Sequence, residues 1–271
     1  MNKLKIGKYS DNIALYVLLF VVSIVIALVS LDFLNIDWDA YCSISLDSAA
    51  TEASIKCLQE NGFMGIYFNP RVGAPDVHGS WIDSQGVDTF LNLVILALNF
   101  IFRPSTQRLY YYTLIATFVI TSFSMAVLLN KLKYNKLVIF VFSILFSFGP
   151  YHFYRYLFHI AIGNAFSVPL SILMCLYLMD FVDAGENSKK IKIEYCLYGI
   201  LLGLACPYFA FFGLILLAIA FMFCVFDKNR LKKYISRSGC IVAFLVSLFL
   251  TRVPSILFNI INGKNNMAFS R

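Results

Sequence analysis

Long apolar runs without charges constrain this chain more than any other feature of its sequence. The runs are Ile13–Leu31, Leu109–Asn130, Ile160–Met179 and Tyr195–Phe226. A helix needs roughly 20 apolar residues to cross the hydrocarbon core of a membrane. Only 14% of the residues are charged and 60% are hydrophobic, whereas soluble domains carry about 25% charged residues. The sequence therefore predicts an all-α polytopic membrane protein of one domain, residues 1–271, and excludes a soluble enzyme.

Membrane topology explains the net charge of +7, without a nucleic-acid partner. Basic residues gather in short connections between apolar runs, at Lys3–Lys8, Lys131–Lys136, Lys189–Lys192 and Lys228–Arg237. Short basic connections stay on the cytoplasmic side of a membrane. We therefore expect a cytoplasmic N-terminus and all four connections on the same side.

About seven transmembrane helices place all four basic connections on the cytoplasmic side. The first, Ile13–Leu31, shows no cleavage site and is interpreted as an uncleaved signal anchor. Residues 32–108 then form a large external loop. The later predicted spans are Leu109–Asn130, Leu137–Tyr151, Ile160–Asp180, the two halves of Tyr195–Phe226, and Cys240–Asn262. Tyr195–Phe226 is too long for one span, so a hairpin turning around Cys206-Pro207-Tyr208 is expected.

One apolar segment, Val87–Phe102, is left out of the span count. As a helix of about 15 residues it reaches only about 22 Å. If it crossed the membrane, the lysines at Lys131–Lys136 would face outward. We expect a helix lying in the outer interface; the alternative is a short second span that inverts every later helix.

The external loop carries most of the acidic residues and several aromatic ones. Nine of the 15 acidic residues lie between Asp32 and Asp88. Ser45–Gln59 contains neither Gly nor Pro and predicts a helix with Asp47 at its start, where a carboxylate can cap backbone N–H groups. Asn61-Gly62 should end this helix. Cys42 and Cys57 form either a disulfide or two reduced thiols.

A resemblance rests on two blocks of motifs. The first is an external helix that opens with an Asp and ends in Glu60-Asn61-Gly62, followed by Asn-Pro-Arg-Val-Gly-Ala-Pro at residues 69–75. The second is Pro-Tyr-His-Phe-x-Arg at residues 150–155, then His159 and Val168-Pro169-Leu170. Together they resemble a bacterial family of predicted multi-spanning glycosyltransferases of the GT-C fold, over roughly residues 30–271. Leu46 stands where that family usually has Gly.

The resemblance implies a fold and an activity. Such proteins have one span, a large external loop with membrane-parallel helices and then further spans, in the bacterial inner membrane. They use polyprenyl-phosphate-linked sugars, with an acid of the first loop as base, here Asp47; Asp88 lies near another of the family's acids. Chains of the family are about twice as long, so both an active enzyme and a truncated product without the later spans are expected alternatives.

Three polar residues of the second block are spaced to share one helix face. His152, Arg155 and His159 lie three and four residues apart. With Asp88 they are the candidate substrate-binding residues, in which Arg155 and His152 hold a lipid phosphate; interfacial snorkelling is the alternative. Arg252 interrupts the last apolar run and should face the bundle or snorkel outward. The tyrosines at 110–112 are interpreted as an interfacial aromatic belt.

The function predicted from these residues is transfer of a sugar from a polyprenyl-phosphate donor to an envelope glycan or lipid acceptor. Asp47 is the expected catalytic base, and membrane lipids are the expected surroundings. No cofactor is expected, although a divalent metal is left open. The alternative is a non-enzymatic membrane component, either a glycan-lipid transporter or an inactive accessory fragment. A transporter should place its polar residues near the middle of broken spans.

Overall fold

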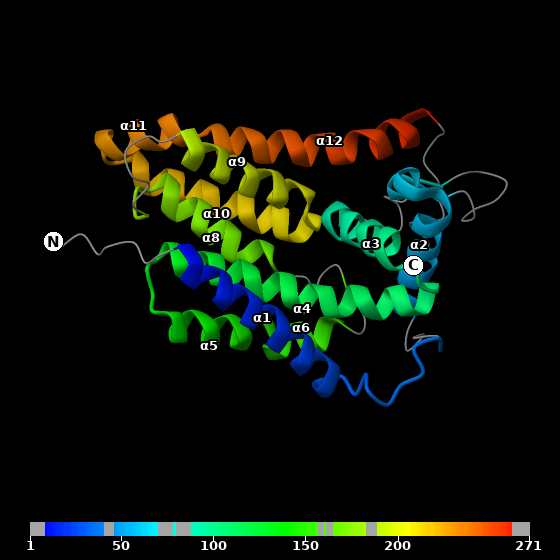
Figure 1. Cartoon of the computed structure of the whole chain (residues 1–271). Coiled ribbons are helices and arrows are strands. Elements are labelled where there is room, and N and C mark those ends of the chain that lie inside the picture. Colours follow the sequence, from blue (N-terminus) through cyan, green and yellow to red (C-terminus); the bar gives the residue numbers. More distant parts are fainter. Residues whose placement is uncertain are drawn as a thin grey trace.

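A computed structural model of the chain describes residues 9–40, 46–69, 78–79, 88–156, 160, 165–182 and 189–261 (Figure 1). In this part the chain is all-α apart from one antiparallel pair of two-residue strands, β1 (Phe68–Asn69) and β2 (His78–Gly79). The longer helices are α1 (Tyr9–Ser30), α2 (Leu46–Asn61), α3 (Thr89–Phe102), α4 (Thr106–Lys131), α5 (Lys136–Ser147), α6 (Pro150–Tyr156), α8 (Ser167–Leu178), α9 (Lys189–Leu204), α10 (Pro207–Val225), α11 (Lys228–Arg237) and α12 (Gly239–Ile261).

Helix length and hydropathy identify a multi-pass membrane protein. In the described part, four stretches are long and apolar enough to span: Ile13–Ser30, Thr106–Lys131, Lys136–Arg155 and Pro207–Val225. The bent pair α11–α12, with an angle of 45° between its halves, adds a fifth. The sequence predicted about seven spans. The two predicted spans that are not among these five correspond to α8 and α9.

Both of these helices differ from the predicted spans for local reasons. The described part of Ile160–Asp180 contains only the 12-residue α8, which reaches about 18 Å. It starts at Ser167, two residues before Pro169, because Pro is tolerated in the first turn of a helix. Helix α9 has only 16 residues, begins with lysines and contains Glu194, so it is both shorter and more charged than the helices identified as spans. As predicted, a break before Pro207 separates α9 from α10.

The first long helix runs antiparallel to the central helix α4. Ser23 Oγ of α1 lies 3.1 Å from Ser122 Oγ of α4. Leu15 and Leu19 pack with Leu129 near the end of α4, whereas Ala27 belongs to the cluster around the start of α4. The chain therefore leaves and re-enters the bundle at the same end between α1 and α4. This geometry is the one expected if the segment containing α3 does not cross the membrane.

The two ends of the bundle differ in chemistry. At the end called here the basic end lie the start of α1, the α4–α5 connection, the start of α9, and α11 (Figure 1). At the opposite end α2 and α3 lie across the start of α4, and we call the described residues between α1 and α4 the cap (Figure 1). Asp180 ties the basic end together by accepting from Lys233 and, at 2.6 Å, from Arg237.

The largest interface joins two parallel helices, α9 and α12. Ser247 Oγ donates to the Ile200 backbone oxygen at 3.0 Å, and the Arg252 guanidinium donates to the Ala205 oxygen at 3.3 Å. Gly199 and Gly203 are one turn apart and let the backbones approach, since a Cβ on Gly203 would lie 2.6 Å from the Phe244 oxygen. Small residues four apart drive close packing of membrane helices in this way.

The tyrosines at the start of α4 are not the lipid-facing belt that the sequence predicted. Tyr110 is 0% exposed and Tyr111 is 6% exposed. Tyr111 packs edge-on against Phe33 and Trp38, with ring centroids 5.2 and 5.6 Å apart. These aromatic contacts fix the segment after α1 to the start of α4, so the tyrosines hold the cap in place.

Candidate functional site

Helix α2 is anchored to the bundle by its apolar face. Ile55 and Leu58 are 0% and 2% exposed and belong to one buried cluster with Leu109 of α4. The helix ends at Asn61, and Gly62 follows with φ +57°, a left-handed conformation that favours glycine. The predicted end of this helix at Asn61-Gly62 is therefore confirmed.

The predicted base, Asp47, is the second residue of α2. An acid in the first turn of a helix is stabilised by the helix dipole, so its place is compatible with a structural role as well as a catalytic one. Its side chain lies outside the described residues. Cys42 also lies outside them, so the alternatives of a Cys42–Cys57 disulfide or two reduced thiols both stay predictions. Glu60, which belongs to the first motif block, lies 3.9 Å from Lys56 in an exposed i,i+4 pair.

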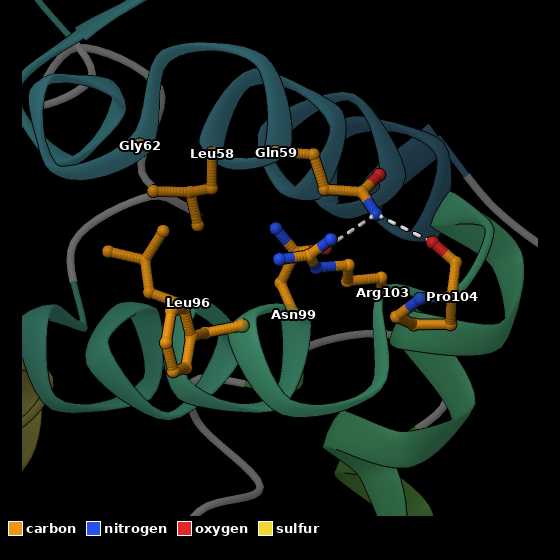
Figure 2. Close-up of a pocket in the computed structure, with 8 residues that line it drawn as sticks. Leu58, Gln59, Gly62, Leu96, Asn99, Arg103 and Pro104 are labelled. Atoms are coloured by element: carbon orange, nitrogen blue, oxygen red, sulfur yellow. Dashed lines mark hydrogen bonds between the residues drawn. The ribbon is translucent and has the colours of Figure 1, made fainter.

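A pocket of about 460 Å³ opens between α2 and α3 (Figure 2). Apolar walls come from Leu58 of α2 and from Leu96 and Phe100 of α3. The polar side is formed by Gln59 and Asn99, with Arg103 and Pro104 of the turn that follows α3. Its volume lies within the range of about 300–1,000 Å³ that is usual for small-molecule sites.

Gln59 organises the polar side of the pocket. Its Nε2 donates to the Pro104 backbone oxygen at 3.0 Å and to Asn99 Oδ1 at 3.2 Å, while its Oε1 accepts from Thr106 Oγ1 at 2.6 Å (Figure 2). Because Pro104 offers only an acceptor, Gln59 Nε2 must be the donor, and the Asn99 atom that faces it must be oxygen. The amide nitrogen of Asn99 is thereby turned away from Gln59.

Arg103 closes α3 in a left-handed conformation, with φ 46° and ψ 49°. Its backbone N–H donates to the Asn99 oxygen, as in a helix C-cap. The side chain reaches back across the pocket toward Asn99 (Figure 2). Within the described residues its guanidinium has no hydrogen bond or ion pair.

Asp88 lies deeper, where α3 begins. It is 2% exposed, and its Oδ1 accepts from the Leu91 N–H at 2.9 Å, so it caps the helix. Its charge also interacts with Arg252 of α12 and with Cys206 at the α9–α10 turn. Arg252 therefore faces the bundle, as expected for an Arg in an apolar helix. Sequence reasoning did not pair these two residues, because 163 intervening residues separate them.

His152 is buried against α4. Its Nε2 lies 3.1 Å from Thr117 Oγ1, and its ring stacks on Phe118 with centroids 4.0 Å apart and an angle of 11°. Thr117 lies near the middle of the 26-residue α4. His152 therefore lies inside the bundle, whereas the sequence placed it at the outer interface.

The other residues of the second block are placed less closely. Arg155 is half-exposed and lies over the Tyr154 ring, 5.7 Å from its centroid. Helix α6 thus turns His152 toward α4 and leaves Arg155 nearer the surface. His159 lies outside the described residues. No contact within the described part joins Asp88 to His152, so His152 in the bundle, Asp88 at the start of α3 and the pocket between α2 and α3 are three separate polar positions.

A charged network closes the cap beside the pocket. Arg108 of α4 donates to both oxygens of Asp39, at 2.9 and 2.5 Å, and Ser105 Oγ donates to Asp39 at 2.7 Å. The hydrogen bonds from Arg108, and then that from Ser105, lower the pKa of Asp39 below its usual range. This network holds the turn before α4 against the segment after α1.

Sequence reasoning missed the pocket residues Gln59, Asn99 and Arg103. Their signal was present: Asn99 and Arg103 are four residues apart at the polar end of an apolar helix. What the sequence did not contain was their partner on α2. In the described residues, no three His, Cys, Asp or Glu side chains form a group that could hold a metal ion.

Comparison with known proteins adds no family to this description. No protein-family model, no curated protein and no solved structure matches the chain.

Proposed function

We propose that this chain is a membrane glycosyltransferase of GT-C-like architecture. It would transfer a sugar from a polyprenyl-phosphate donor to an envelope glycan or lipid acceptor. One observation carries the proposal: α2, whose second residue is Asp47, is packed over one end of the bundle, and the opposite end of α2 lines a pocket with apolar walls and a cationic rim. Such a pocket suits a substrate with an anionic head and an apolar tail.

The topology of the proposal uses seven crossings. Helices α1, α4, α5–α6, α8, α9, α10 and α12 alternate in direction, with the N-terminus and the basic end cytoplasmic. The cap then lies outside the inner membrane, and α3 lies in the outer interface. The aromatic and aliphatic side chains at the end of α3 support this, since Phe100 and Ile101 are 79% and 66% exposed. Such a patch is favourable in lipid and costly in water.

The proposed mechanism is inverting transfer. Asp47 removes the proton from an acceptor hydroxyl, which attacks the anomeric carbon of the donor sugar while the bond to the lipid phosphate breaks. An aspartate with an ordinary pKa of about 3.9 is ionised at working pH and can serve as the base. The released polyprenyl phosphate keeps the electron pair of the broken bond.

The test is Asp47→Asn in the full chain, in membranes. Asn matches Asp in size. The substitution removes only the charge at the helix start, which contributes about 0.3–1 kcal/mol of stability. We expect sugar transfer to be abolished while membrane insertion and Tm stay close to wild type. Asp37→Asn is the matched control, because Asp37 is an exposed acid of the same external segment. Transfer by Asp47→Asn at the wild-type rate would refute the catalytic role of Asp47.

A transporter of glycan lipids is the second candidate, and the bundle interior favours it. His152 contacts the middle of α4, and Arg252 donates to the Ala205 backbone oxygen beside the break between α9 and α10. Transporters place their sites at such broken helices. Helix α4 is about 39 Å long, and its first turns pack against the cap. A hydrocarbon core of about 30 Å therefore surrounds the later part of α4. His152 then lies in the outer half of the membrane.

One pair of assays separates the two candidates. An enzyme should transfer labelled sugar from a polyprenyl-phosphate donor presented on the cap side, in sealed proteoliposomes. A transporter should move the same donor between leaflets without cleaving it. A chain that moves intact donor and transfers no sugar would contradict the glycosyltransferase proposal.

A further inference from the structure

The pocket between α2 and α3 contains hydrogen-bond donors that no group of the described residues accepts from. Asn99 Oδ1 already accepts from Gln59, and Gln59 is engaged through both ends of its amide. Within the described residues, Asn99 Nδ2 has no acceptor, and neither does the guanidinium of Arg103. A guanidinium and an amide nitrogen can only donate. Arg103 is exposed, so its donors face the opening of the pocket, where an anion that accepts several hydrogen bonds can replace the water around them.

Among the described residues, the neighbouring acids Asp39 and Glu60 are paired with other cations than Arg103. Asp39 is paired with Arg108, and the Glu60 carboxylate lies 3.9 Å from Lys56. Arg103 projects from the turn after α3, where the left-handed conformation of its backbone aims the side chain over Asn99 (Figure 2). A planar guanidinium binds the oxygens of a phosphate or a carboxylate in pairs.

The walls of the pocket indicate that the anion carries an apolar tail. Leu58, Leu96 and Phe100 line one side. The side chains next to the opening are also apolar, since Ile101 and Phe102 are 66% and 60% exposed at the end of α3. A small hydrated anion gains nothing from these surfaces, whereas a lipid can lay its chain along them.

We propose that this pocket binds the phosphate group of a membrane lipid, with Arg103 and Asn99 as its donors and the Leu58–Leu96–Phe100 wall against its chain. Gln59 is a positioning residue, because it fixes the orientation of Asn99 and holds Pro104. The identification of the lipid as the sugar donor rests on the proposed function; the binding of a lipid phosphate does not.

The experiment measures equilibrium binding to the detergent-solubilised full chain, without turnover. Three probes separate the chemistry: farnesyl phosphate carries phosphate and chain, farnesol carries the chain alone, and inorganic phosphate carries the head alone. We expect farnesyl phosphate to bind at least about tenfold more tightly than either other probe, because charge-assisted hydrogen bonds and burial of the chain act together.

Variants then assign the donors. Arg103→Gln should weaken farnesyl phosphate binding by about ten- to a hundredfold, and Arg103→Lys by less, since it keeps the charge without the paired donors. Asn99→Asp keeps the acceptor for Gln59 but places a negative charge in the pocket, so it should abolish binding. Lys56→Gln removes an exposed cation of α2 that does not line the pocket, and binding should stay unchanged. The Tm of each variant shows whether it is folded.

Each contrary result contradicts one part of the proposal. Wild-type affinity in folded Arg103→Gln, or an equal loss in Lys56→Gln, contradicts the assignment of the phosphate to this pocket. Equal binding of farnesol contradicts a phosphate site, and equal binding of inorganic phosphate contradicts a lipid ligand. If binding behaves as expected but no sugar is transferred, the lipid site stands and the glycosyltransferase proposal fails. If sugar transfer is normal in Arg103→Gln, the glycosyltransferase proposal stands and the lipid site at Arg103 fails.

Discussion

Replacing Gly203 by Ala tests how the bundle holds its interior polar residues. Gly203 lies where the backbones of α9 and α12 are in close contact, and α12 carries Arg252 toward the Ala205 oxygen. A Cβ at position 203 would lie 2.6 Å from the Phe244 backbone oxygen and 2.7 Å from the Leu248 nitrogen, against 3.4 Å for ordinary contact. Since these atoms belong to the backbone, no side-chain rotation relieves the clash.

The magnitude follows from that distance. The helices must separate locally by about 0.8 Å, and a gap of 0.5–1 Å forfeits about a quarter to a half of each dispersion contact. Overpacking of this kind costs about 1–3 kcal/mol. Ala recovers up to about 1 kcal/mol because Gly is the weaker helix former. We expect a net loss of about 0.5–2 kcal/mol, which corresponds to a fall in Tm of roughly 1–8 °C for a chain of this size.

Buried cysteines provide the assay. Cys175 and Cys240 are 6% and 1% exposed, so a dye that fluoresces when it reacts with thiols reports unfolding of the detergent-solubilised protein. Gly239→Ala is the matched control, because its Cβ would meet only Cys196 Sγ at 3.8 Å. A Tm for Gly203→Ala at or above that of wild type would refute the close packing, and so would an equal fall in Gly239→Ala.

Three further predictions concern two charged residues and the membrane topology. Asp88→Asn preserves the helix cap but removes the buried charge that interacts with Arg252, so it should lower the Tm. A double variant with Arg252→Gln should lose about 0.5–3 kcal/mol less than the two single losses combined, and strict additivity in thermal unfolding would contradict the interaction. Because the pKa of Asp39 is lowered, its contribution to stability is present above the unfolded pKa of about 3.9 and is lost as the pH falls through the folded value. The difference in Tm between wild type and Asp39→Asn should therefore shrink on acidification below about pH 5, whereas a constant difference would contradict it. Single cysteines at Ser84 and Asn229 should be labelled from opposite sides of the membrane, and labelling of both from one side would exclude the seven-crossing topology.

The sequence determined the helices and several of their ends, because these depend on local chemistry. Uncharged apolar runs predicted the membrane helices, and the long run Tyr195–Phe226 was correctly divided at Pro207, which lacks the N–H that a continuous helix needs. Gly62 ended α2 as expected. The basic connections also predicted which helix ends gather on one side, and the bundle has them at one end (Figure 1).

Only the tertiary structure decided which side each polar or aromatic residue faces. Tyr110 was predicted to belong to an interfacial aromatic belt, but it is buried because the segment after α1 folds over it. His152 was expected at an interface and lies against Thr117. The charges of Asp88 and Arg252 interact although 163 residues separate them in the sequence. Periodicity identifies a helix, but the partner of each face is set by long-range packing of helices that are apolar nearly all round, so their sequences do not show which face is inside.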